Sequence, residues 1–157
     1  MQTMSKQKSM RWLWWSLFVV WAILTFFLSS QNGDGSASLS QKIALWFWRG
    51  MRLVFGESVS HIRFIVFHHF FRKMTHFVVH MILAFFLVRA SCWTFSSRKT
   101  ALWFSWIFAI LIAVIDEAVQ LIAPGRVGTF YDAWLNLGGI TLGAFISSLL
   151  GPKNLNK

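Results

Sequence analysis

The sequence predicts an all-α protein that is embedded in a membrane. Its composition is 56% hydrophobic and only 13% charged, whereas typical soluble domains carry about 25% charged residues. Long stretches without Lys, Arg, Asp or Glu cover residues 12–28, 74–88, 100–115 and 133–150. They lack the sustained alternation of apolar and polar residues that the strands of a membrane β-barrel require. In lipid, such stretches satisfy their own backbone hydrogen bonds as helices.

Four transmembrane helices are expected within one domain that comprises residues 1–157. The second apolar stretch is short for a span, so its helix should begin before Arg72. The predicted spans cover roughly residues 12–30, 70–90, 100–123 and 132–150. A cleaved signal peptide is the alternative for the first span, because Ser36-Ala37-Ser38 has the small residues of a cleavage site. That site lies far from the apolar run, which favours the helix.

An interfacial amphipathic helix is expected between the first two spans. Residues 31–41 are rich in Gly, Asn, Asp and Ser, which predicts a loop. Residues 42–55 then place apolar side chains at helical spacing, namely Ile43, Phe47, Met51 and Val54. Basic residues interrupt this stripe, and Trp46 and Trp48 suit the headgroup region of a bilayer. A short helix packed on the bundle is the alternative for this segment, and Gly56 is expected to end the helix in either case.

The net charge of +10 indicates contact with anionic lipid headgroups. The basic residues lie beside apolar runs and are not accompanied by RNA-binding signatures, so membrane lipids, and not nucleic acid, are the expected partners. The single cysteine, Cys92, excludes an internal disulfide and a multi-cysteine metal site. His69, His76 and His80 have helical spacing suited to a metal, but no acidic residue accompanies them in the intervening turn, so neither a metal nor a cofactor is expected.

The distribution of basic residues predicts a multi-pass plasma membrane protein with cytoplasmic termini. Four spans place both termini on one side, together with the short loop 89–100. This loop contains Arg89, Arg98 and Lys99, and short basic loops stay in the cytoplasm. The segment 31–72 is also basic and falls outside, but long segments weigh less in that rule.

This topology gathers the polar residues at the outer ends of the spans. Three of the five acidic residues lie within positions 116–132. A carboxylate in a span costs a few kcal/mol, roughly 2.5–3.5 on insertion scales, so it normally faces protein or a wet cavity. Asp116 points about 100° away from Glu117 on a helix, so the two acids need not serve the same site. The polar residues at the outer ends are Ser29, Ser30 and Gln31; Arg72, Lys73 and His76; Glu117, Gln120 and Arg126; and Asp132 and Asn136.

Each of these residue types is suited to one role in a polar site. His76, Glu117 and Asp132 are the candidate catalytic residues, since histidine titrates near neutrality and carboxylates exchange protons. The candidate ligand-binding or anion-binding residues are Arg72, Lys73, Arg126, Gln31, Gln120 and Asn136. Structural alternatives remain open, because Asp132 can cap a helix, Glu117 can form an ion pair with Arg126, and the basic residues can anchor headgroups.

The ordered motifs resemble the VanZ-like membrane protein family. They are LSSQ at 28–31, RKMTH at 72–76, DEAVQLIAPGR at 116–126, and the pair Asp132 and Asn136. The resemblance extends over roughly residues 12–150 and implies a connection with resistance to glycopeptide antibiotics such as teicoplanin. One departure is His80, where the family usually has a tyrosine four residues after the motif histidine.

These observations favour an outer-leaflet site for an anionic, lipid-linked envelope ligand such as a cell-wall precursor. The residues are compatible with catalysis of a reaction on this ligand as well as with its binding. The protein can form a homo-oligomer in either case. The alternative is a non-enzymatic subunit whose polar cluster only holds the helix bundle together. A transporter is less favoured, because the cytoplasmic halves of the spans lack polar residues and four spans would need to oligomerise to form a path.

Overall fold

The computed structural model describes residues 2–30, 33–56, 63–122 and 130–150, and the regular structure in these ranges is entirely helical. This confirms the predicted all-α class. The helices are α1 (Gln2–Ser29), α2 (Gly33–Phe55), α4 (Phe64–Cys92), α5 (Arg98–Ile122) and α6 (Phe130–Leu149). Of these, α1, α4 and α5 contain segments long and apolar enough to cross a membrane, at Gln7–Ser29, Phe64–Cys92 and Arg98–Ile122.

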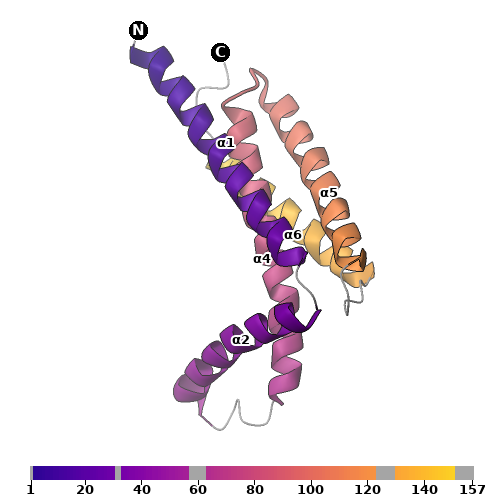
Figure 1. Ribbon diagram of the computed structural model, residues 1–157. Helices are drawn as coiled ribbons and strands as arrows, with labels where there is room; N and C mark the ends of the chain where they lie inside the picture. Colours follow the sequence, from indigo (N-terminus) through magenta and orange to yellow (C-terminus); the bar gives the residue numbers. More distant parts are fainter. Residues whose placement is uncertain (1, 31–32, 57–62, 123–129, 151–157) are drawn as a thin grey trace.

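Helix α4 is the centre of the arrangement (Figure 1). Its N-terminal part packs against α2, and its remainder packs against α1, α5 and α6. The bundle core contains Phe18, Leu83, Leu87, Ala109 and Ile140. The start of α4 at Phe64 confirms that the second apolar helix begins before Arg72.

Two glycines allow α6 to lie directly on α4. A Cβ atom added at Gly139 would collide with the backbone carbonyl of Phe77, and one at Gly143 would collide with the carbonyl of Met81. Small residues four apart are typical of such close helix contacts in membranes, where dispersion between backbones drives association. Helix α6 covers most of the residues of the predicted fourth span, but among the described residues only α1, α4 and α5 are long and apolar enough to cross a membrane, so a fourth span stays a prediction.

One end of the bundle is fixed by hydrogen bonds between helices. The Trp15 indole donates to Thr94 Oγ1 at 2.9 Å. The guanidinium of Arg89 donates to the Leu150 carbonyl, and that of Arg98 donates to the Ser148 carbonyl. The N-terminal half of α1, the connection from α4 to α5 and the C-terminal end of α6 therefore share this end. The predicted polar residues of α5 and α6 lie toward the opposite end.

The structure corrects two predicted loops. Residues 31–41 were expected to be a loop, but α2 is helical from Gly33 onward. A contact with α4 stabilises this first part, since Ser40 Oγ and His68 Nε2 are hydrogen-bonded at 2.9 Å. The predicted loop 89–100 is also shorter than expected, because α4 continues to Cys92 and α5 begins at Arg98.

Helix α2 packs on α4 through Ala44 and Trp48 as well as through part of the predicted apolar stripe, since the ring centroids of Phe47 and Phe71 are 5.5 Å apart. Within residues 38–55, the part of α2 whose side chains are described, the buried residues are Ala44 and Trp48, and Trp48 is only 7% exposed. The Trp48 ring contacts Phe64 and Phe67 of α4, with ring centroids 6.1 Å and 5.1 Å apart. Trp46 is instead 72% exposed. The helix ends where predicted, and Gly56 has a φ of +54° that favours glycine.

Candidate functional site

A buried carboxylate lies on the inner face of α5. The buried residues of this helix are Ala101, Ser105, Ala109, Ile112, Asp116 and Gln120, which repeat at helical spacing. The stripe begins with small residues that let α5 approach α4, and it carries Asp116 into the bundle with no exposed surface. Glu117 is the next residue and points about 100° away, so it is only partly buried.

Gln120 connects Asp116 to α1. Its side-chain nitrogen Nε2 donates to Asp116 Oδ2 at 2.8 Å and to Ser29 Oγ at 3.4 Å. The first contact joins residues four apart on one helix, which is favourable geometry for side-chain pairs. The second contact joins the C-terminal ends of α5 and α1. Gln120 therefore orients the carboxylate and holds two helices together.

His80 of α4 faces the same carboxylate. Its Nδ1 lies 3.0 Å from the backbone carbonyl of His76. A carbonyl only accepts hydrogen bonds, so Nδ1 carries the proton and Nε2 is the nitrogen that can gain or lose one. Nε2 lies 3.9 Å from Asp116 Oδ2, which is an ion-pair distance and longer than a hydrogen bond. The two side chains form a buried polar pair that joins α4 to α5.

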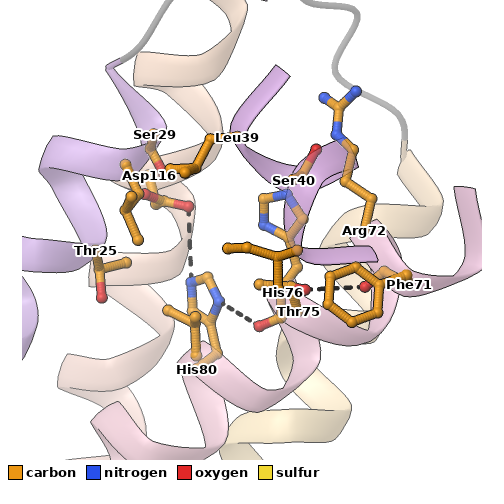
Figure 2. Close-up of a pocket in the computed structure, with 13 residues that line it drawn as sticks. Thr25, Ser29, Leu39, Ser40, Phe71, Arg72, Thr75, His76, His80 and Asp116 are labelled. Atoms are coloured by element: carbon orange, nitrogen blue, oxygen red, sulfur yellow. Dashed lines mark hydrogen bonds and ion pairs between the residues drawn. The ribbon is translucent and has the colours of Figure 1, made fainter. Parts of the chain in front are cut away.

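A cavity of about 200 Å³ opens next to this pair (Figure 2). Side chains of α1, α2, α4 and α5 surround it. Asp116 and His80 face each other across one part of it, and Arg72 and His76 lie one turn apart on α4. The remaining lining residues are Thr25, Leu28, Ser29, Leu39, Ser40, Ile43, Phe71, Thr75 and Val79. The cavity thus combines a cationic side chain, the His80–Asp116 pair and apolar walls.

The structure brings together only part of the predicted site. Arg72 and His76 line the cavity, and Gln120 contacts its carboxylate. Lys73 is exposed and is absent from the lining. Asp132 is partly buried in the first turn of α6, where an acidic side chain favours the helix dipole. Gln31 and Arg126 lie outside the described residues.

Glu117 and Asn136 line a different space. They contribute to a groove of about 490 Å³ between α5 and α6. His76 lines the first cavity, so the structure does not bring together the candidate catalytic residues His76 and Glu117. The pair that does meet is His80 and Asp116. The small-residue stripe Ala101, Ser105 and Ala109 leads to Asp116 on the same helix face, and this is the sequence signal that could have identified it.

The described residues contain no cluster suited to a metal ion. Within residues 2–30, 33–56, 63–122 and 130–150, no three His, Cys, Asp or Glu side chains are close enough to share one. By residue type, the imidazole of His80 and the carboxylate of Asp116 can exchange protons, and the guanidinium of Arg72 can bind an anion.

Comparison with known families identifies the chain. The sequence profile of the VanZ/LLP1 family matches residues 14–151. The chain belongs to the VanZ/LLP1 family. The match includes α2, α4, α5, α6 and most of α1, so every helix that lines the cavity falls within the VanZ/LLP1 region. Comparisons with characterised proteins and with solved structures give no match.

Proposed function

We propose that the cavity between α1, α2, α4 and α5 binds the anionic headgroup of a lipid-linked envelope ligand, such as a cell-wall precursor. The observation that carries this proposal is the combination of Arg72 and His76 with the buried pair His80 and Asp116 in one cavity. A guanidinium binds phosphate through two parallel hydrogen bonds. The His80–Asp116 pair can exchange a proton with a ligand phosphate or hydroxyl.

The membrane arrangement that suits this function has four spans, with α6 as the fourth and with cytoplasmic termini. The bundle end with Arg89 and Arg98 is then cytoplasmic, in agreement with the positive-inside rule. The cavity lies toward the opposite end and therefore in the outer leaflet of the plasma membrane. Glycopeptide antibiotics act on that side, so a contribution to resistance against teicoplanin follows from ligand binding there.

Helix α2 is proposed to lie in the headgroup region beside the cavity. One face packs on α4, while a second face exposes apolar side chains, among them Trp46 at 72% and Leu53 at 89%. Its basic residues Lys42, Arg49 and Arg52 are also exposed. A helix with an exposed apolar face and exposed basic residues binds well at an anionic bilayer surface. Because Leu39, Ser40 and Ile43 line the cavity, this position would place the cavity entrance near lipid headgroups.

The direct test is binding of a polyprenyl diphosphate to the purified protein in lipid nanodiscs. We expect Arg72→Ala to weaken binding by about ten- to a hundredfold, because loss of one charge-assisted contact costs roughly 1.5–3 kcal/mol. Lys73→Ala is the matched control, since Lys73 is adjacent, basic and exposed. Equal affinities for both variants and the parent protein would exclude the cavity as the anion site.

A purely structural role is the second candidate, favoured by the Gln120 hydrogen bond that links α5 to Ser29 of α1. The structural role and the binding proposal are distinguished in cells that express each variant and are challenged with teicoplanin. Under the binding proposal, Arg72→Ala reduces protection at unchanged protein abundance. Under the structural alternative, Asp116→Asn and Gln120→Ala lower the abundance of the protein. Protection against teicoplanin then falls only in proportion to that abundance.

A further inference from the structure

A row of apolar side chains on α2 borders the cavity and continues beyond it. Leu39 and Ile43 line the cavity, and Phe47 follows at the same spacing of four residues. Residues four apart share one face of a helix, so these three form a single row, here called the α2 row. Their side chains are 44%, 44% and 47% exposed. Each of them therefore has surface available for contact with another molecule.

The packing of α2 on α4 keeps the α2 row next to the cavity. The neighbouring row of α2 contains Ser40, which is hydrogen-bonded to α4, and the buried residues Ala44 and Trp48. Phe47 stays close to the cavity, because its ring lies 5.5 Å from that of Phe71, which is a lining residue. From its first to its last residue, the α2 row extends about 12 Å at 1.5 Å per residue. It is a continuous apolar path that begins inside the cavity.

The cavity end of this path carries a positive charge. Arg72 lines the cavity and is partly buried. Among the residues that the structure describes, no carboxylate lies within ion-pair distance of its guanidinium. A guanidinium binds phosphate through two parallel hydrogen bonds. A phosphate near Arg72 and a hydrocarbon chain on the α2 row are therefore two parts of one amphiphilic ligand.

The volume of the cavity restricts the group that it can hold. A volume of about 200 Å³ is below the roughly 300–1,000 Å³ of pockets that hold drug-sized ligands. A phosphate group fits in this space, whereas a sugar chain or a peptide must remain outside. The part of an envelope ligand that the cavity recognises is therefore the phosphate next to the lipid chain.

The width of the α2 row restricts the number of chains. On one side it is bounded by the row that packs on α4. On its other side lie Lys42 and Arg49, which are both exposed. A second hydrocarbon chain on that side would cover charged groups, and burial of a charge without a partner is unfavourable. The α2 row therefore suits one chain and not two.

We propose that the cavity and the α2 row bind a single-chain lipid phosphate of the polyprenyl type. The phosphate lies at Arg72, and the first part of the chain lies along Leu39, Ile43 and Phe47. This inference rests on the proposed function and narrows it to a class of ligand. The α2 row selects the lipid chain, and the sugar or peptide that the phosphate carries is not part of the recognition.

The test is a competition experiment with the full-length protein in phosphatidylcholine nanodiscs. A polyprenyl phosphate with a photoactivatable group near the phosphate is the probe, and crosslinking is measured by mass spectrometry. The competitors are polyprenyl phosphate, phosphatidic acid and inorganic phosphate. We expect polyprenyl phosphate to compete about tenfold more strongly than phosphatidic acid, the factor that corresponds to burial of one apolar side chain. Inorganic phosphate should not compete at the same concentration.

Two outcomes of the competition would overturn the proposal. Equal competition by the two lipids would show that the number of chains does not matter. Equal competition by inorganic phosphate would show that the chain contributes nothing and that the site takes a free anion. The position of the crosslinks is a further readout, since residues 39–47 should be labelled. Labelling that excludes these residues would contradict the proposed path of the chain.

Ile43→Asn places an amide in the α2 row. The side chain is half exposed, so the fold should tolerate the change. We expect polyprenyl phosphate to bind about fivefold more weakly, because a half-exposed isoleucine contributes about half of the transfer free energy of a fully buried one. Leu53→Asn is the matched control, since Leu53 is on the same helix, is 89% exposed and lies outside the cavity lining. Equal affinities of these two variants would contradict a role for the α2 row.

Failure of this inference is distinguishable from failure of the proposed function. If neither lipid competes, or if Arg72→Ala binds both lipids as well as the parent protein does, the cavity is not an anion site and both proposals fail. If Arg72→Ala weakens the binding of both lipids but the parent protein binds them equally, the proposed function stands and only the single-chain class is overturned.

Discussion

Asp116 Oδ2 and His80 Nε2 lie 3.9 Å apart in the bundle interior, and neither residue has any exposed surface. The pair joins α5 to α4, and both side chains line the cavity. Removal of one partner would leave the other buried polar group without it, and a buried polar group that loses a partner costs roughly 1–3 kcal/mol. The pair is therefore a determinant of stability as well as a candidate for chemistry.

His80→Phe should lower the thermal stability of the protein, whereas His80→Tyr should retain most of it. A phenylalanine leaves Asp116 without a partner on α4, but a tyrosine hydroxyl can donate a hydrogen bond to the carboxylate. The two variants differ by one hydroxyl, so each is the control for the other. Size-exclusion chromatography after heating in detergent measures the difference. Identical thermal transitions for the variants His80→Phe and His80→Tyr would show that a hydrogen-bonding group at position 80 does not stabilise Asp116.

Gly139→Ala and Gly143→Ala should each destabilise the contact between α4 and α6. The added methyl group would meet the backbone carbonyl of Phe77 or Met81, and overpacking costs roughly 1–3 kcal/mol. At about 2–4 °C per kcal/mol for a chain of this size, the unfolding temperature should fall by several degrees.

Gly138→Ala is the matched control for these two variants. A Cβ atom at Gly138 would lie 3.4 Å from the Phe77 ring, which is an ordinary contact with a side chain. Alanine also favours a helix over glycine by about 1 kcal/mol. We expect unchanged or higher stability for Gly138→Ala. A similar loss in all three variants would argue against the close approach of α6 to α4.

Trp48→Ala should release α2 from α4. Trp48 is 7% exposed and packs on Phe64 and Phe67, and truncation of a buried aromatic side chain costs roughly 3–5 kcal/mol. Hydrogen exchange in residues 38–55 should become faster, while exchange in α5 should not change. Trp46→Ala is the control, because that ring is 72% exposed. Equal exchange in the two variants would contradict the observed packing face.

The proposed orientation predicts which cysteines react in intact cells. After Cys92→Ser, a single cysteine at Ser30 should react with a membrane-impermeant maleimide, and one at Ser97 should not. Both positions are exposed and lie at opposite ends of the bundle. Cys92 itself is buried. Reaction at position 97 alone would invert the protein and place the cavity toward the cytoplasm, where an outer-leaflet ligand cannot reach it.

The sequence by itself determined the helical class, the family and the end of the bundle at which polar residues gather. Long uncharged stretches in lipid satisfy their backbone hydrogen bonds by forming helices. The motifs and their order along the chain indicate the family. The sequence also named Arg72 and His76, which line the cavity, and Gln120, which contacts Asp116. These properties depend on composition and on order along the chain, which a sequence displays directly.

Only the tertiary structure decided which polar residues face one another. The choice between Asp116 and Glu117 depends on the rotation of α5 about its axis, and that rotation is set by packing of Ala101, Ser105 and Ala109 against α4. Neighbouring positions on a helix differ by about 100°, so a rotation of that size about the axis of α5 would exchange the positions of the two acids. The helical start of α2 was missed for a related reason, because its contact between Ser40 and His68 joins residues far apart in the chain.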